Sequence, residues 1–273
     1  MAYFSITQDQ VDQFHHDGYL YVPDLFSAEE MDLVIQASTA GNVLEDHALE
    51  REDDSGKVSK LTVWNHPGDD IFGRIARCDR IVNTMERVLD DEVYHWHSKM
   101  MIKEPEVGGA WVWHQDYGYW YEFGCLFPDM ASCMVAVNRA SRENGCLQVL
   151  KGSHKLGRIR PMKVGNQIGC DPERVEQADK QFELVYCEME PGSGLFFHSN
   201  TLHRSAANES QDGRWVLICC YNTKHNSPFG ESRHPEYTPI KRIADRDVAE
   251  AGAGLDSERV YSNFNPPSPK SQA

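Results

Sequence analysis

Two neighbouring stretches decide the fold: Gly194-Leu-Phe-Phe-His-Ser-Asn-Thr-Leu-His-Arg-Ser-Ala-Ala-Asn208 and Arg214-Trp-Val-Leu-Ile-Cys-Cys-Tyr221. Each holds a short apolar run bounded by turn-forming or polar residues, which is typical of a buried β-strand. The first stretch continues into a loop that carries His203, and the second begins with a single cation, Arg214. If these strands pair antiparallel across 208–213, His203 and Arg214 lie near one another.

Runs of the same kind recur through the middle of the chain, at 93–102, 110–117, 132–138, 146–150 and 184–189. They are rich in Val, Ile, Tyr, Trp and Cys and are separated by clusters of Gly, Pro, Asn and Asp. Seven or eight such strands predict a mainly β fold, a barrel or a sandwich, rather than a doubly wound α/β fold. Neither of the phosphate-binding motifs G-x-G-x-x-G and G-x-x-x-x-G-K-[ST] occurs, which argues against a nucleotide-binding fold.

The first 92 residues predict a helical layer that supports this β-core. Thr7 is a candidate N-cap for a helix that ends at Gly18, and Ser27 forms a capping box with Glu30. Apolar residues at helical spacing predict one further helix over 71–89, whereas the charged segment 44–60 indicates a mobile surface loop. We therefore expect one domain over 1–273: helical support in 1–92, the β-core in 93–225, and an extension with a frayed Pro/Ser-rich tail in 226–273.

Charge and composition exclude several classes of protein. The 273 residues contain 27 Lys and Arg against 42 Asp and Glu, a net charge of −15, which argues against binding to nucleic acid or an anionic membrane. No apolar run approaches the ~20 residues of a spanning helix, and the N-terminus lacks the pattern of a secretory signal. We expect a cytoplasmic protein whose eight cysteines are buried free thiols, because several of them lie in apolar strand-like runs and no signal peptide is evident. No C-x-x-C pair occurs, which argues against a zinc knuckle. The oligomeric state is left open.

The segment Trp111-Val-Trp-His-Gln-Asp-Tyr-Gly-Tyr-Trp120 carries the clearest chemistry. On a strand, His114 and Asp116 project to the same face and can occupy two positions of a metal's octahedron. One more histidine completes a 2-His-1-carboxylate facial triad. A simple His–Asp hydrogen bond at a strand end is the alternative. Arg214, if aimed into a barrel, needs an anionic partner such as a dicarboxylate; otherwise it is a solvated loop residue.

The ordered set of motifs resembles the phytanoyl-CoA dioxygenase superfamily of Fe(II)/2-oxoglutarate oxygenases, whose fold is a double-stranded β-helix, or jelly roll. The matching segments are Asp17-Gly-Tyr, His114-Gln-Asp116, Glu143-Asn-Gly-Cys-Leu-Gln-Val-Leu-Lys-Gly-Ser-His154, and His203-Arg-Ser-Ala-Ala-Asn208 with Arg214. They span nearly the whole chain in the family's order.

The resemblance implies a role for each matching residue. His114, Asp116 and His203 would hold Fe(II), with His203 preferred over His198 because a Ser and an Asn follow it in the family pattern. Arg214 would anchor the C5 carboxylate of 2-oxoglutarate with help from Ser205, and His97 would contact the same co-substrate. Because Asp116 retains the carboxylate that related halogenases lack, the resemblance implies an O2-dependent hydroxylase that releases succinate and CO2. His154 is expected to be structural.

The substrate is expected to be a small molecule. The segment from His114 to Trp120 looks like the ectoine-hydroxylase branch, although the residues between Asp116 and Trp120 differ from that branch. Seven aromatic residues in 111–123 suit a cation–π box as well as a strand core, so we expect a small zwitterion: amino-acid-like, betaine-like or an aminophosphonate. Trp120 and Tyr117 are the candidate contacts. The alternatives are an acyl-CoA hydroxylase of the same superfamily, a cupin-like Zn or Mn isomerase or lyase, and a non-catalytic scaffold.

Overall fold

The computed structural model describes residues 4–40 and 43–255, so the predicted frayed Pro/Ser-rich tail, 263–273, lies outside the described residues. Its α-helices are α1 (Gln8–Asp17), α2 (Ala28–Thr39), α3 (Val43–Asp46), α4 (Ile71–Arg77), α5 (Asp79–Leu89), α6 (Asp116–Glu122) and α7 (Pro172–Asp179). Its strands are β1 (Tyr19–Val22), β2 (Leu49–Glu52), β3 (Val58–Trp64), β4 (Val93–Lys103), β5 (Trp111–His114), β6 (Met130–Ala136), β7 (Leu147–Leu150), β8 (Pro161–Val164), β9 (Gln167–Cys170), β10 (Leu184–Cys187), β11 (Gly194–His198), β12 (His203–Ser205) and β13 (Arg214–Thr223). Short 3-10 turns are η2 (Ser153–Leu156), η3 (Lys224–Asn226), η4 (Asp245–Asp247) and η5 (Ala249–Ala251).

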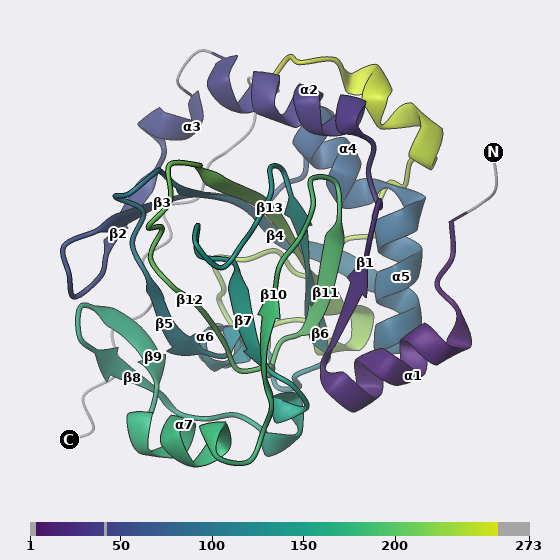
Figure 1. Cartoon of the computed structure of the whole chain (residues 1–273). Coiled ribbons are helices and arrows are strands. Elements are labelled where there is room, and N and C mark those ends of the chain that lie inside the picture. Colours follow the sequence, from purple (N-terminus) through teal and green to yellow (C-terminus); the bar gives the residue numbers. More distant parts are fainter. Residues whose placement is uncertain (1–3, 41–42, 256–273) are drawn as a thin grey trace.

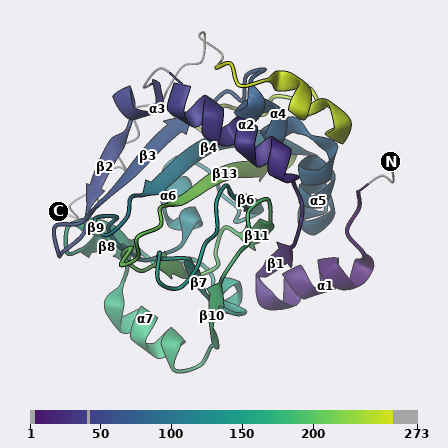
Figure 2. The ribbon, with the colours of Figure 1, turned by 45° about the horizontal axis from the view of Figure 1, so that its top comes forward.

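Two antiparallel sheets face each other (Figure 1). The larger sheet has the order β1-β11-β6-β13-β4-β3-β2, and the smaller one has the order β10-β7-β12-β5. The hairpin β8–β9 lies beside β5 and forms a sheet of its own. Helices α2, α4 and α5 cover the outer face of the larger sheet, as the tilted view in Figure 2 shows. This is the predicted mainly β arrangement with a helical layer.

Alternation along β13 explains why the larger sheet is buried on both faces. Leu217, Cys219 and Tyr221 pack with the helices in one apolar cluster. Their neighbours Ile218 and Cys220 pack in a second cluster, between the two sheets. Since side chains of a strand alternate between faces, an almost continuous apolar run is required here. All eight cysteines are buried free thiols, as predicted.

Most of the predicted elements are present, and two caps are confirmed in detail. Thr7 and Ser27 form capping boxes with Gln10 and Glu30, and Gly18 ends α1 with a left-handed φ of 81°. The seven predicted strands correspond to β4, β5, β6, β7, β10, β11 and β13.

Segment 44–60 is not a mobile loop, which corrects the prediction. It forms α3 and most of the hairpin β2–β3, and β3 pairs with β4 over Lys60–Trp64. Asp53 holds the hairpin turn, because its Oδ1 accepts hydrogen bonds from the Ser55 and Lys57 amides at 2.8 and 3.1 Å. Glu50 and Glu52, which made the segment look like a loop, point to solvent from an edge strand.

Three further predictions about local structure are corrected. The single helix over 71–89 is two helices that break at Cys78, whose ψ of 151° is extended. The strand over 110–117 ends at His114, and Asp116 begins α6. The predicted β-hairpin across 208–213 is absent from the described structure, because β12 pairs with β5 and β7 whereas β13 pairs with β4 and β6. The connection therefore crosses from one sheet to the other.

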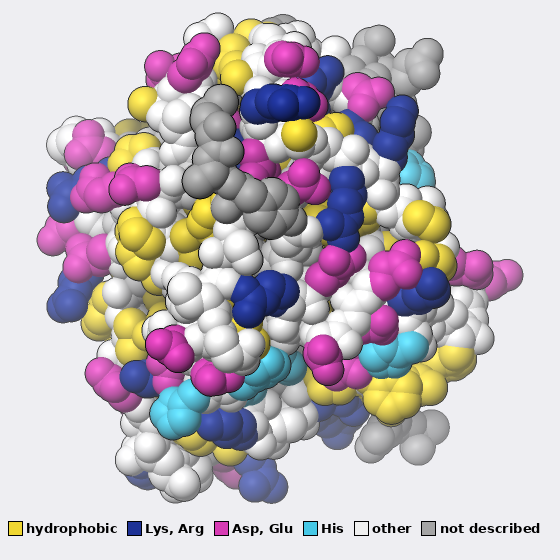
Figure 3. Space-filling model, turned by 90° about the vertical axis from the view of Figure 1, so that its right-hand side faces the viewer, with side chains coloured by type: hydrophobic (Ala, Val, Ile, Leu, Met, Phe, Trp, Pro, Cys, Tyr) yellow, Lys and Arg dark blue, Asp and Glu magenta, His cyan; other side chains and the backbone are white. Residues whose placement is uncertain are grey.

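The helix-covered side of the molecule carries acidic and basic side chains mixed together (Figure 3). This face shows no broad basic surface, in keeping with the net charge of −15.

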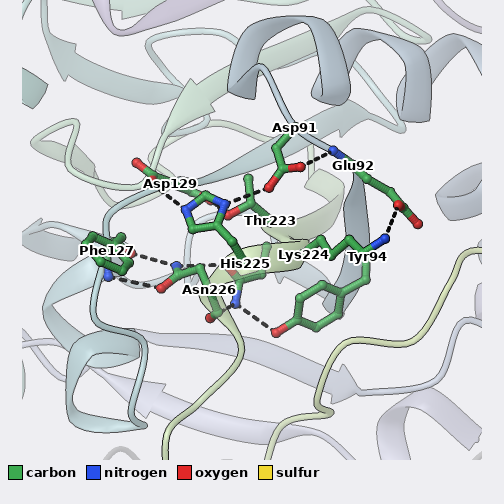
Figure 4. Close-up of polar contacts among 10 residues, drawn as sticks. Asp91, Glu92, Tyr94, Phe127, Asp129, Thr223, Lys224, His225 and Asn226 are labelled. Atoms are coloured by element: carbon green, nitrogen blue, oxygen red, sulfur yellow. Dashed lines mark hydrogen bonds and ion pairs between the residues drawn. The ribbon is translucent and has the colours of Figure 1, made fainter.

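A polar cluster fastens the end of β13 to two other segments (Figure 4). His225 contacts Asp91 Oδ2 through Nδ1 at 2.6 Å and Asp129 Oδ2 through Nε2 at 3.0 Å. Beside it, Lys224 pairs with Glu92 at 2.8 Å. The hydrogen bond to Asp91 raises the pKa of His225. This cluster ties the starts of β4 and β6 to the segment that follows β13.

Buried histidines make the metal-free protein acid-sensitive. Burial lowers the pKa of His198 and His234 to about 3, so the folded protein keeps them neutral where the unfolded chain binds protons with a pKa of ~6.5. Stability therefore falls as pH falls below ~6.5, whereas the raised pKa of the half-exposed His225 acts weakly in the opposite direction. We expect the melting temperature in chelator to drop by at least ~2 °C from pH 7.5 to 5.5. A melting temperature that is constant or rises toward pH 5.5 would contradict this assignment.

Candidate active site

One cavity of about 470 Å³ lies between the two sheets. Side chains from β3, β4, β5, α6, β6, β11, β12 and β13 line it, and residues of β2 and β9 reach its edge. It contains most of the residues that the sequence singled out: His97, His114, Asp116, Trp120, His203, Ser205 and Arg214.

His114, Asp116 and His203 converge at one point of this cavity. His114 ends β5, and its partner across the sheet is His203, the first residue of β12. Asp116 enters from the first turn of α6, so the side chains meet through a strand-to-helix turn rather than along one strand. The Nε2 atoms of both histidines lie 3.9 Å from Asp116 Oδ1, and one ligand atom from each residue lies within 4.8 Å of the others. In residues 4–40 and 43–255, no other trio of His, Cys, Asp or Glu converges in this way.

Backbone carbonyls set the tautomers of the two histidines. His114 Nδ1 lies 2.8 Å from Val112 O, and His203 Nδ1 lies 2.8 Å from Thr201 O. A carbonyl only accepts, so each Nδ1 carries the proton and each Nε2 presents a lone pair. Burial lowers the pKa of His114 to about 3 and also lowers the pKa of His203. Both rings are thus neutral ligands at ordinary pH.

Asp116 is an ionised and oriented carboxylate. Burial alone would raise its pKa, but the Lys99 cation and the hydrogen bond from Ser132 help to hold the pKa below its usual range. Lys99 Nζ lies 3.8 Å from Oδ1, and Ser132 Oγ donates to Oδ2 at 3.3 Å. Two neutral imidazoles and one carboxylate on one side of a site fit Fe(II) with open positions for further ligands.

Arg214 is a buried cation whose guanidinium faces the cavity. The side chain is 1% exposed, and its Nε and Nη1 atoms have no hydrogen-bond partner among the described residues. Its Nη2 contacts only Met101 Sδ, at 3.7 Å, among the hydrogen bonds of the described structure. Burial lowers the pKa of Arg214 to about 10, so it stays charged. A buried and unsatisfied guanidinium calls for a carboxylate, which fits 2-oxoglutarate.

The remaining predicted residues divide into those at the cavity and those away from it. His97 lines the cavity, with its ring 5.8 Å from that of Trp120. Tyr117 does not line it, because the phenol turns away and donates to Leu126 O at 2.6 Å. His198 packs its ring against His154, 5.4 Å away, outside the converging trio.

Sequence reasoning missed several polar residues of the cavity, among them Lys99, Arg51 and Gln167. Lys99 could have been predicted, because His97, Lys99 and Met101 are two residues apart on one strand and their side chains therefore share a face. Arg51 could not have been, because its position depends on the hairpin β2–β3. Tyr119 was one of the seven aromatic residues of 111–123 considered for the substrate, and it lines the cavity.

Comparison with known proteins assigns the family. The model of the phytanoyl-CoA dioxygenase family matches residues 14–216. The chain belongs to the phytanoyl-CoA dioxygenase family. It is 27% identical to an ectoine dioxygenase of Stutzerimonas stutzeri, over 84% of this chain and 82% of that protein. It is also 27% identical to an L-proline trans-4-hydroxylase of Streptomyces griseoviridis, over 86% of this chain and 95% of that protein.

Solved structures agree with this family membership. The crystal structure of EctD from S. alaskensis with 2-oxoglutarate and 5-hydroxyectoine superposes with a TM-score of 0.72 at 25% identity, covering 88% of each chain. The predicted double-stranded β-helix is thereby confirmed. This phytanoyl-CoA dioxygenase family member is an Fe(II)- and 2-oxoglutarate-dependent dioxygenase that acts on a small molecule. Among its described helices, none has the length and apolar character needed to cross a membrane.

Proposed function

We propose that the enzyme hydroxylates an unactivated C–H bond of a small zwitterion, which is amino-acid-like, betaine-like or an aminophosphonate. One observation carries the proposal: two neutral imidazoles, an ionised carboxylate and an arginine whose Nε and Nη1 have no partner among the described residues face the same cavity. Arg51 and Val63, from the N-terminal part of the chain, line the same cavity as residues of the β-core. This supports our proposal that 1–273 acts as one domain. The eight free thiols support a cytoplasmic location.

In this proposal His114, Asp116 and His203 hold the iron. Bound Fe(II), with 2-oxoglutarate and O2, supplies the oxidation of C–H to C–OH and converts 2-oxoglutarate into succinate and CO2. The protein holds both imidazoles by their Nδ1–H groups and holds the carboxylate by Ser132 and Lys99. These contacts leave the three ligand atoms little freedom, which lowers the cost of binding the metal.

Arg214 receives the C5 carboxylate of 2-oxoglutarate, with Ser205 as its hydrogen-bonding helper and His97 as a further polar contact. All three side chains line the cavity, and Arg214 and Ser205 come from different sheets. Burial lowers the pKa of His97 well below its usual value, so this ring is a neutral contact.

The substrate lies against the aromatic part of the cavity, where Trp120 is joined by Trp111, Tyr119 and Phe197. Tyr117 supports α6 from outside the cavity through its bond to Leu126 O. The relatives support the choice of substrate class, since one is named for ectoine and another for L-proline.

The test combines a spectrum with a substrate screen. Anaerobic addition of Fe(II) and 2-oxoglutarate is expected to give a weak visible charge-transfer band. Succinate release is then measured with small amines, betaines, aminophosphonates and acyl-CoAs. Turnover with acyl-CoA alone would overturn the zwitterion, and turnover of a substrate without O2 and 2-oxoglutarate would instead indicate a cupin-like isomerase or lyase.

Gln115 gives a separate prediction about how the site is held. Its Nε2 donates to Gly157 O and Asn200 O, both at 2.8 Å, and its Oε1 accepts from the Ile159 amide at 2.7 Å. It therefore ties the segment between His114 and Asp116 to the loop that leads to His203. We expect Gln115→Leu to weaken Fe(II) binding by ~10-fold or more, because three backbone groups, at least partly buried, lose their partner.

Gln148→Leu is the matched control. Gln148 is also buried, but its amide oxygen accepts from the Arg204 side chain on the smaller sheet. Fe(II) titration of both variants, with their melting temperatures, separates loss of positioning from loss of stability. Equal Fe(II) affinities in the two variants would contradict the role of Gln115.

A further inference from the structure

A second buried basic residue, Lys103, lies next to Arg214 on the larger sheet. The two are register partners on β4 and β13, so their side chains leave the sheet on the same face. Met101, two residues before Lys103 on β4, lines the cavity and shows that this face points inward. Lys103 is 0% exposed and Arg214 is 1% exposed. Like charges directly opposite on neighbouring strands repel each other, and burial removes the water that would screen them.

No acidic side chain of the described structure pairs with either residue. Among the described residues, neither has a carboxylate oxygen within 4.0 Å. Lys103 Nζ donates to Ala206 O, in the connection between β12 and β13. The carboxylate of Asp53 acts on Lys103 from the β2–β3 turn, but its two oxygens already accept from backbone amides. The Cys146 thiol is close to both residues, and burial raises its pKa to about 11, so it is neutral.

These surroundings favour an uncharged Lys103 for as long as no anion is bound. Burial, followed by the Arg214 cation, lowers the pKa of Lys103 well below its usual value, whereas Arg214 stays charged. Lysine also gives up its proton far more readily than arginine, so Lys103 is the member of the pair that loses its charge. A carboxylate placed against Arg214 reverses the balance, because the anion favours the protonated form of a nearby amine.

We propose that Lys103 is a positioning residue for 2-oxoglutarate, and that it takes up a proton when the C5 carboxylate binds at Arg214. This inference rests on the proposed function and adds that the co-substrate binds together with one proton from solvent. Ala206, which holds Lys103 Nζ, directly follows Ser205, the proposed helper of the same carboxylate. The charge therefore forms beside the C5 carboxylate, and a 2-oxoacid that lacks this carboxylate does not induce it.

Calorimetry measures the proton directly. 2-Oxoglutarate is titrated into the anaerobic Fe(II) enzyme in HEPES and in Tris, which have different ionisation enthalpies, and the difference in heat gives the number of protons taken up. We expect ~0.5 proton or more for 2-oxoglutarate and ~0.1 or less for 2-oxovalerate, which lacks the C5 carboxylate. The affinity for 2-oxoglutarate is then expected to fall ~3-fold or more per unit as the pH rises from ~7 to ~9, because fewer protons are available at high pH.

Three variants assign the proton to its residue. Lys103→Met is expected to lose the uptake and to bind 2-oxoglutarate ~10-fold more weakly at pH ~7. Lys103→Arg is charged at every pH, so it is expected to lose the uptake but to bind 2-oxoglutarate more tightly than Lys103→Met. Lys57→Met is the matched control, because Lys57 Nζ donates to Asn208 O of the same connection at 3.2 Å but is only half-buried. This variant is expected to keep the wild-type uptake.

The wild type alone can overturn the inference: it fails if 2-oxoglutarate brings no more protons than 2-oxovalerate. It also fails if Lys103→Met keeps the uptake, which would place the proton on another group. The charge-transfer band separates this failure from that of the proposed function. A wild type that shows the band without the uptake keeps the iron and 2-oxoglutarate sites and loses only the role of Lys103, whereas a wild type without the band removes the proposed function itself.

Discussion

Replacing His203 with alanine is expected to abolish the visible band that Fe(II) and 2-oxoglutarate produce anaerobically, and to weaken Fe(II) binding by ~100-fold or more. The loss follows from the geometry, since His203 Nε2 lies 3.9 Å from Asp116 Oδ1 and its ring centre lies 4.0 Å from that of His114. With one of three ligand atoms gone, the other two cannot define a face of the coordination sphere.

The control is His198→Ala, five residues earlier in the chain. His198 Nδ1 accepts from the Asn200 amide at 3.0 Å, and its ring packs between Phe14 and His154. Its loss is expected to lower the melting temperature but to leave the band in place. The metal-site assignment is wrong if His198→Ala loses the band while His203→Ala keeps it.

Local sequence patterns were sufficient to predict many of the helices and strands, because the pattern of buried residues in an element repeats every few residues. Strand β13 is apolar on both faces, so its run of Val, Leu, Ile and Cys identifies it without any knowledge of its partners. Caps such as Thr7 and Ser27 depend on contacts three residues away. The spacing of His114-Gln-Asp116 was compatible with two metal ligands, and the resemblance to the family supplied the full set with His203. The predicted strand over 110–117 was wrong, because Asp116 lies in the first turn of α6.

Features that depend on distant pairing were not visible in the sequence. Leu49–Glu52 is mostly charged, and it forms a strand because the neighbouring strand β3 pairs with β4. Arg51 could therefore not be placed at the cavity. Similarly, His203 and Arg214 reach the cavity from opposite sheets, an arrangement that spacing along the chain does not distinguish from a hairpin.

Arg214→Gln is expected to weaken 2-oxoglutarate binding by ~100-fold or more while Fe(II) binding stays within about threefold. The reason is that Arg214 is 1% exposed and that its Nε and Nη1 have no partner among the described residues. A buried guanidinium in this state lacks the interactions that would repay its desolvation, and in our proposal the co-substrate carboxylate provides them. Arg214→Lys keeps the charge but not the bidentate fork and is expected to fall between the two.

The partner of Arg214 is identified by a thermodynamic cycle with 2-oxovalerate, which has the carbon chain of 2-oxoglutarate without the C5 carboxylate. The wild type is expected to prefer 2-oxoglutarate by ~100-fold, and Arg214→Gln to lose most of that preference, because each change removes one half of the same interaction. The same cycle can be measured as the rise in melting temperature that each oxoacid causes in each variant. A ligand that binds the folded state more tightly raises the melting temperature more. If Arg214→Gln still prefers 2-oxoglutarate strongly, the C5 carboxylate is bound elsewhere, and Lys103, which is buried close enough for Arg214 to lower its pKa, becomes the next residue to replace.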